Sequence, residues 1–190
     1  MNAIKIVGVG SYIPELIKKN EDFLNHQFYN EDGTAFDEHP EIIIKKFEKI
    51  TGIQERRYVE NHLTVSDIAV IAAQNAIQDA NIDAEDLDYI IFAHNFGDVK
   101  HNTEQTDIVP SLASRVKHQL KIKKASCVAY DVIFGCPGWI EASIQAKSFI
   151  DSGIAQKCLV IGGETLSRVV DPHDRDSMIY ADGAGATIME

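Results

Sequence analysis

The feature that most constrains the fold of this chain is the run from Tyr130 to Trp139, which continues as an apolar segment as far as Gly153. An apolar run that leads into a Gly-Cys-Pro-Gly turn predicts a strand, a sharp turn and then a buried helix. Cys136 falls in the turn, where the helix begins. Pro137 suits the first helical position, because the N–H that proline lacks would have no partner there.

Cys136 therefore occupies a place where a thiol can become a nucleophile. A helix N-terminus carries about half a positive charge and unpaired N–H groups, and both favour a thiolate over a thiol. Gly135 and Gly138 have no side chains, so another molecule can approach the sulfur closely. The alternative is a buried cysteine that only packs, which is common for free cysteines. The turn ahead of a long apolar helix favours the nucleophile.

Composition narrows the class of protein. The chain has 190 residues, 45% of them hydrophobic, which fits one ordinary domain with a sizeable core. Its net charge of −11 argues against general binding of nucleic acid and favours a soluble acidic protein. The cysteines at positions 127, 136 and 158 give neither a disulfide framework nor a metal-ligand spacing, so we expect a reducing cytoplasm. We expect no signal peptide, and no apolar run approaches the roughly 20 residues that span a bilayer.

The order of patterns along the chain predicts an α/β fold. Continuous apolar runs such as Tyr89 to Ala93 are typical of strands buried on both faces of a parallel sheet. The pattern predicts strands over 3–9, 87–93, 125–132, 157–161 and 184–189, and helices over 41–50, 64–80, 110–120 and 137–151. We therefore predict a mixed, mainly parallel five-stranded sheet with helices on both faces.

Two glycines near the start of the chain raise a second possibility. Gly8 and Gly10 follow an apolar run, and such a pattern can begin a dinucleotide-binding fingerprint. The third glycine is missing, and Pro14 argues against a helix that opens there. The pattern therefore predicts a turn at positions 8–11 rather than a nucleotide site.

Several polar segments are interpreted as surface. Residues 15–41 are rich in acids, and we expect an exposed excursion there. His94 and His101 are isolated, and we expect both to be solvated. The basic residues between Arg115 and Lys124 predict either a solvated helix end or a dock for an acidic partner.

Five stretches, taken in order, resemble the N-terminal half of beta-ketoacyl-acyl-carrier-protein synthase III and related condensing enzymes of the thiolase fold. The matching stretches are Gly8 to Pro14, Thr51 to Arg57, Asp131 to Gly138, Asp171-Pro172 with Asp174-Arg175, and Asp182 to Ala186. Any one of them is weak, but five in register are specific. The resemblance implies that residues 1–190 form one N-terminal thiolase-like domain, truncated before the second half of such an enzyme.

The resemblance also implies roles for individual residues. Cys136 would take an acyl group from an acyl-CoA or an acyl-carrier thioester, for decarboxylative condensation with a malonyl thioester in fatty-acid, lipid or polyketide synthesis. Arg175 matches a residue that borders the coenzyme A entrance, and Tyr180 falls near the same channel. Coenzyme A enters as part of the substrate, so no separate cofactor is implied.

The chain departs from the family pattern in places that bear on the substrate. Lys46 stands where the family has an aromatic that stacks on adenine, with Phe47 adjacent. The span from Pro14 to Thr51 is longer than the family's, and Arg175 sits one residue closer to Asp182. These departures favour a relative that acts in secondary lipid or polyketide synthesis. The family's catalytic histidine and asparagine fall in the second half, so we expect no condensation activity from this chain alone.

The resemblance further implies a homodimer that pairs through the strand at about 125–131, and an acyl carrier protein as a possible partner. It implies no nucleic acid and no membrane. Two other functions stay open. One is an enzyme like hydroxymethylglutaryl-CoA synthase or thiolase that uses the same cysteine. The other is a non-catalytic subunit for acyl binding or dimerisation, against which the presence of Cys136 counts.

Overall fold

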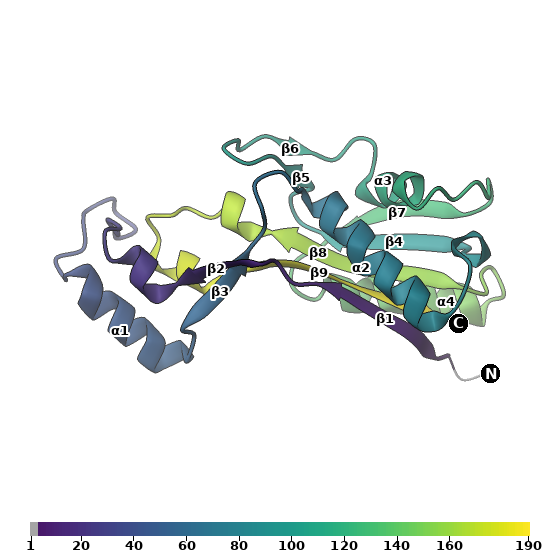
Figure 1. The fold of residues 1–190 in the computed structure, drawn as a ribbon, viewed down its shortest axis with the longest axis horizontal. Helices are drawn as coiled ribbons and strands as arrows, with labels where there is room; N and C mark the ends of the chain where they lie inside the picture. The colour runs from purple at the N-terminus through teal and green to yellow at the C-terminus, as the bar shows by residue number, and fades with distance from the viewer. Residues whose placement is uncertain (1–3) are drawn as a thin grey trace.

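The computed structural model describes residues 4–190 and shows a five-stranded sheet in the order β1-β9-β8-β4-β7 (Figure 1). Strand β4 pairs in parallel with β7 and β8, whereas β9 runs antiparallel to β8 and β1. The strands are β1 (Ile6–Tyr12), β4 (Tyr89–His94), β7 (Val128–Ile133), β8 (Cys158–Thr165) and β9 (Asp182–Met189). The predicted mixed sheet of five strands is confirmed. The predicted strand start at Ala3 lies outside the described residues.

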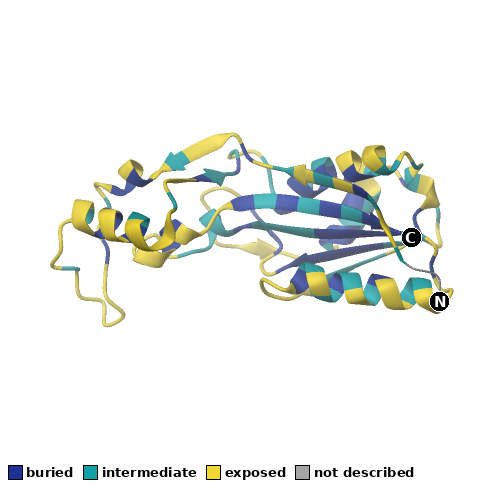
Figure 2. Cartoon of the chain, turned by 90° about the horizontal axis from the view of Figure 1, so that it is seen from below, coloured by how far each residue is buried: buried dark blue, intermediate teal, exposed yellow. Residues whose placement is uncertain are grey.

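Helices cover both faces of this sheet, as predicted. Helices α2 (Val65–Ala80) and α3 (Leu112–Gln119) pack on one face, and α4 (Gly138–Asp151) packs on the other. Four alanines of α2 are wholly buried, so its backbone lies close to the strands. They are Ala69, Ala72, Ala73 and Ala76. The buried residues of Figure 2 accordingly concentrate in the sheet and on the inner sides of its helices.

The turn predicted at positions 8–11 is wrong, because β1 continues without interruption to Tyr12. A Cβ atom on Gly10 would lie 2.2 Å from the carbonyl oxygen of Ala72, and one on Gly8 would lie 2.4 Å from that of Ala76. The two glycines therefore allow α2 to pack directly on the backbone of β1. Close packing, rather than a turn, explains them.

The elements at the other end of the molecule form what we call the small lobe (residues 16–58 with 171–179). It contains β2 (Leu16–Lys19), the short 3-10 helix η1 (Asn20–Phe23), α1 (Pro40–Thr51) and β3 (Glu55–Tyr58). In Figure 1 it projects to the left of the sheet. Phe23 and Phe28 are buried there against α1 and Met178. The expectation of an exposed excursion over 15–41 is confirmed for its eight acidic side chains, which are all exposed, and is wrong for Phe23 and Phe28.

Arg56 holds the small lobe together from inside. Its guanidinium donates hydrogen bonds to the carbonyl oxygens of Met178 and Lys18 and to Oδ1 of Asn20, at 3.0, 3.1 and 2.7 Å. Burial lowers the pKa of Arg56, and only 4% of the residue is exposed. A buried guanidinium with three oxygen partners joins chain segments that a few apolar side chains alone would hold weakly.

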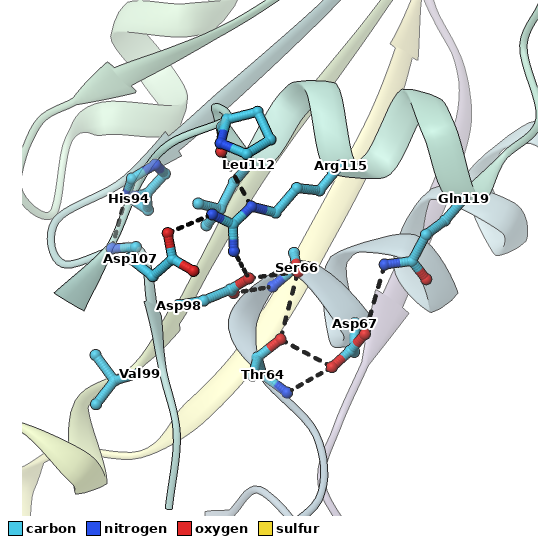
Figure 3. A network of polar contacts seen from close by, with 12 residues as sticks. Thr64, Ser66, Asp67, His94, Asp98, Val99, Asp107, Leu112, Arg115 and Gln119 are labelled. Atoms are coloured by element: carbon cyan, nitrogen blue, oxygen red, sulfur yellow. Dashed lines mark hydrogen bonds and ion pairs between the residues drawn. The ribbon is translucent and has the colours of Figure 1, made fainter. Parts of the chain in front are cut away.

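A second polar network joins helices α2 and α3 to the hairpin of β5 (Asp98–Val99) and β6 (Thr106–Asp107) (Figure 3). Arg115 of α3 lies 2.7 Å from Oδ2 of Asp98 and 2.6 Å from Oδ1 of Asp107. Asp98 also accepts hydrogen bonds from the backbone N–H and the hydroxyl of Ser66, at the start of α2. One arginine thus links two helices and the hairpin.

His94 belongs to the interior, so its prediction as a solvated residue is wrong. Its Nδ1 accepts the N–H of Gly97 at 3.1 Å, and its Nε2 lies 3.0 Å from Oδ2 of Asp131. Asp131 also accepts the first two N–H groups of α3, and this helix begins at Leu112 rather than at Pro110 as predicted. His101, by contrast, is exposed.

The two ends of the described chain lie side by side at one end of the sheet (Figure 1). Lys5 donates its N–H to the carbonyl oxygen of Glu190 at 2.8 Å, and Glu190 donates its own to Lys5 at 3.0 Å. The side chain of Lys157 lies 3.3 Å from that of Glu190. The backbone pairing of β1 with β9 therefore continues one residue beyond the two strands, to Lys5 and Glu190.

Candidate active site

Cys136 lies in the turn between β7 and α4, as the sequence predicts. The parallel strands β4, β7 and β8 all end at the same edge of the sheet, where α/β proteins commonly carry functional groups. The N–H of Phe134 donates to the carbonyl oxygen of His94 at 3.2 Å, and that of Gly138 donates to Gly135 at 2.8 Å. Helix α4 begins at Gly138, one position later than predicted.

The three cysteines differ sharply in accessibility. Cys136 is exposed, whereas Cys127 and Cys158 are buried. Burial raises the pKa of the Cys158 thiol to about 12 and also raises the pKa of Cys127. Among the three, Cys136 is therefore the thiol that an outside molecule can reach.

The first turn of α4 is fitted directly onto the sheet. A Cβ atom on Gly138 would lie 3.0 Å from Cβ of Ala93, so glycine lets the helix start on top of β4. One on Gly162 of β8 would lie 3.3 Å from Cβ of Trp139. Nothing lies within 4 Å of the corresponding position on Gly135. The turn is thus anchored on its inner side and open beside the sulfur.

Sequence interpretation missed one polar pair at the same edge of the sheet. Asn95, just after β4, donates its backbone N–H and its Nδ2 to the same oxygen of Glu164, at 2.7 and 3.0 Å. The signal was present, because the loop after β4 follows a buried strand at the functional edge of the sheet. The partner, 69 residues away, became visible only in the fold.

The structure brings three of the predicted substrate residues together in the small lobe. Lys46, Phe47 and Arg175 line one cavity of about 270 Å³. Phe47 is 8% exposed, whereas Arg175 is exposed and Lys46 pairs with Glu38 at 2.5 Å. Tyr180 is exposed but is not among the residues that line this cavity.

The extra length between Pro14 and Thr51 lies against the loop that carries Arg175. We call residues 24–38 the extension. Tyr29 donates its N–H to the carbonyl oxygen of His173 at 3.0 Å, and the guanidinium carbon of Arg175 lies 5.2 Å from the ring centre of Phe36. The extension therefore forms one wall beside Arg175, a contact that the sequence did not reveal.

Much of the basic cluster predicted between Arg115 and Lys124 is engaged within the protein. Besides the ion pairs of Arg115, the Nζ of Lys117 donates to the carbonyl oxygen of Cys127, and Lys124 lies 2.7 Å from Asp88. These cations are less available to an acidic partner than the sequence suggests. Within residues 4–190, no group of three or more His, Cys, Asp or Glu side chains could hold a metal ion. The described helices are too short or too polar to cross a bilayer.

Comparison with known proteins shows which family this site resembles. Residues 130–190, which include the cysteine turn, match the family described as 3-Oxoacyl-[acyl-carrier-protein (ACP)] synthase III. Over 97% of its length, the chain is 38% identical to Beta-ketoacyl-[acyl-carrier-protein] synthase III 1 of Vibrio vulnificus. The chain resembles this family along nearly its whole length. It is also 37% identical, over its whole length, to the synthase III of Clostridium acetobutylicum.

Solved structures of the synthase III family share the fold. The chain resembles the synthase III of Aquifex aeolicus with a TM-score of 0.74 at 33% identity, over 98% of this chain and 53% of that one. It also resembles the priming beta-ketosynthase of the R1128 polyketide pathway, with a TM-score of 0.78 at 27% identity, over 98% of this chain and 49% of that one. The chain spans about half the length of the curated relatives it matches, 52% for Vibrio vulnificus and 51% for Clostridium acetobutylicum.

Proposed function

We propose that this chain carries the acyl-accepting half of a condensing enzyme. Cys136 takes an acyl group from an acyl-CoA or an acyl-carrier thioester, and the acyl group is then used for decarboxylative condensation in fatty-acid or polyketide synthesis. One observation carries the proposal. The only exposed cysteine of the chain stands at the start of α4, on the functional edge of the sheet, inside the segment that matches the synthase III family.

The geometry of the turn supports nucleophilic attack. Cys136 is exposed in the turn before α4, and Gly135 leaves the approach to its sulfur open. The thiolate attacks the thioester carbonyl, the carbonyl oxygen gains negative charge, and the bond to the coenzyme A sulfur breaks. Backbone N–H groups at the turn would stabilise the oxyanion.

The small lobe offers the entrance for the thioester. Lys46 and Arg175 line an apolar cavity, each beside a carboxylate, Glu38 and Asp176. A thioester ligand whose phosphates replace these carboxylates as partners could place its apolar arm in the cavity. Lys46 is exposed, whereas Phe47 is largely covered and lies near the Arg56 guanidinium, so Phe47 has little free face for stacking.

The second chemical step needs groups that we do not assign to this chain. In the family, a histidine and an asparagine activate the malonyl thioester, and the buried His94 is committed to Gly97 and Asp131. We therefore propose that the chain alone forms the acyl-enzyme and does not condense it. An assay with acyl-CoA and malonyl thioester should give no ketoacyl product, and product formation would contradict this limit.

The edge of the sheet supports the proposal of a homodimer. Strand β7 lies at the edge, and Val128, Ile133 and Phe134 along it are exposed at 43%, 58% and 46%. An uncovered edge strand with apolar side chains favours pairing with a second copy. We expect a dimer by light scattering. A monomer at micromolar concentration would count against it, and so would a Val128→Lys variant that associates as strongly as the unmodified chain.

Intact-mass spectrometry after mixing with a panel of acyl-CoAs tests the acyl acceptor directly. We expect an adduct of the mass of one acyl group on the chain and none on Cys136→Ser. The matched control is Cys127→Ser, which should retain the adduct because that thiol is buried. If no acyl-CoA gives an adduct, the proposal of a catalytic half fails and a non-catalytic binding subunit replaces it. The proposed setting is the cytoplasm, where free thiols persist.

A further inference from the structure

The polar pair of Asn95 and Glu164 has no role in the acyl transfer described so far. Both hydrogen bonds from Asn95 end on one oxygen, Oε2 of Glu164. An amide that is held at its backbone and at its side chain by one carboxylate has a fixed orientation, with the nitrogen turned toward the carboxylate. Within residues 4–190, the second hydrogen on Nδ2 has no protein acceptor assigned to it.

The strand register places this pair beside Cys136. His94 is opposite Ile133 on one side, and Ala93 is opposite Gly162 on the other. Asn95 is one residue beyond His94 and two beyond Ala93, so the continued register places it between Phe134 and Glu164. Neighbouring strands are about 4.8 Å apart and a residue spans at most about 3.5 Å, so the Cα atoms of Asn95 and Cys136 lie within about 12 Å.

The pair also belongs to the face of the sheet that α4 covers. Gly138 of α4 packs on Ala93, and Trp139 packs on Gly162. Side chains two residues apart along a strand share a face. Asn95 and Glu164, each two residues further on, therefore project on the same face as the first turn of α4 and at the same edge as the cysteine.

We propose that Asn95 is a further catalytic residue for acyl transfer to Cys136 and that Glu164 is the positioning residue that fixes its orientation. The inference rests on the proposed function. In that step the bond from sulfur to the carbonyl carbon forms, the bond from that carbon to the coenzyme A sulfur breaks, and the departing thiolate takes up the proton that Cys136 released to water. Asn95 directs its second N–H at the thioester oxygen, where negative charge develops.

Substitution of Asn95 separates this role from a structural one. For Asn95→Ala we expect the rate of Cys136 acylation by acyl-CoA to fall roughly tenfold, the effect of one lost hydrogen bond to a developing charge. Alkylation of the same thiol by iodoacetamide should change less than twofold, because no negative charge develops on a thioester oxygen there. Glu164→Gln, which retains an acceptor, should give a smaller fall in acylation of about threefold.

The control is Gln78→Ala, an exposed amide on α2 that should leave both rates unchanged. If Asn95→Ala acylates at the normal rate, the inference fails while the proposed function stands. If acylation and alkylation fall together, Asn95 only shapes the turn and the inference also fails. If the unmodified chain gives no adduct with any acyl-CoA, the proposed function fails, and the inference, which rests on it, fails as well.

Discussion

The sheet and the small lobe achieve their stability by different means. In the sheet, glycines and alanines bring α2 directly onto β1, and the residues between the layers are almost all apolar and wholly buried. In the small lobe, six apolar side chains are buried around a guanidinium that bonds to three oxygens. The first region depends on shape, and the second depends on one charged group with satisfied hydrogen bonds.

This difference matches the two roles in the proposed reaction, the nucleophile on the sheet and the thioester entrance on the small lobe. Cys136 stands on the densely packed sheet, where a fixed position of the nucleophile is useful. Lys46 and Arg175 stand on the small lobe, where fewer buried contacts leave room for local opening. The comparison teaches that one chain can combine a rigid reactive centre on a closely packed core with an adaptable entrance on a smaller core.

The largest effect should come from filling the close contact in the sheet. Gly10→Ala places a Cβ atom 2.2 Å from one backbone oxygen of α2, so the helix must move away from β1. We expect a loss of about 3 kcal/mol or more in the free energy of unfolding, measured by denaturant titration. The control is Gly185→Ala on β9, where nothing lies within 4 Å and the change should be near zero. Equal losses from the two substitutions would show that the close packing of α2 on β1 does not dominate the stability of the sheet.

The next effect should come from removing the charged centre of the small lobe. Arg56→Met leaves the oxygens of Met178, Lys18 and Asn20 without their donor, at a cost of about 2–3 kcal/mol. Hydrogen exchange should quicken in β2 and β3 and stay slow in β4. The control is the half-buried neighbour, Arg57→Met, whose guanidinium makes only a long bond of 3.4 Å to Pro14 and a partly exposed ion pair with Glu55, so the change should be small. Uniform quickening in both regions would argue that they unfold together.

A smaller effect is expected where helices α2 and α3 meet the β5–β6 hairpin. Arg115→Met removes the ion pairs to Asp98 and Asp107 and leaves a mostly buried carboxylate with only its bonds from Ser66. We expect a loss of about 1–2 kcal/mol by denaturant titration, with faster exchange of the β5–β6 amides. Lys123→Met, at an exposed site nearby, is the control. A loss no larger than that of the control would mean that the hairpin does not depend on Arg115.

The smallest effect concerns pH and the extension. Burial lowers the pKa of His26, and the charges of Lys18 and His173 add to this. Because the folded pKa lies below the unfolded value, packing of the extension is intact above about pH 6.5 and weakens as the pH falls through that value. Hydrogen exchange of residues 27–36, corrected for intrinsic rates, should quicken at pH 5 while β4 is unchanged. In His26→Gln this pH dependence should disappear, and its persistence would assign it to another group.

How much of this could be predicted depends on the range of the contacts. Helix α2 was predictable because Thr64 and Asp67 form a capping box at its start and its buried face repeats along the sequence. The central strands were predictable because they are continuous apolar runs. Gly8 and Gly10 were misread because glycine signals a turn unless a neighbouring helix is known to press against it.

The same distinction between local patterns and long-range contacts applies to the candidate site. The position of Cys136 in a strand-to-helix turn is local, and the sequence predicted it. The shared cavity of Lys46 and Arg175 came from the family resemblance, since no local pattern links residues so far apart. His94 was misread because its partner Asp131 lies on another strand, and Glu164 was overlooked because only the register places it beside Asn95.

The paired backbone of Lys5 and Glu190 has a consequence for chain connectivity. Ends that already exchange hydrogen bonds can be joined by a short flexible linker without stretching either strand. New ends could then be opened at the Gly33 turn, where the glycine is exposed and nothing lies within 4 Å of its Cβ position. Such a circular permutant would keep every element of the sheet in place, and it would place the new ends beside the proposed thioester entrance.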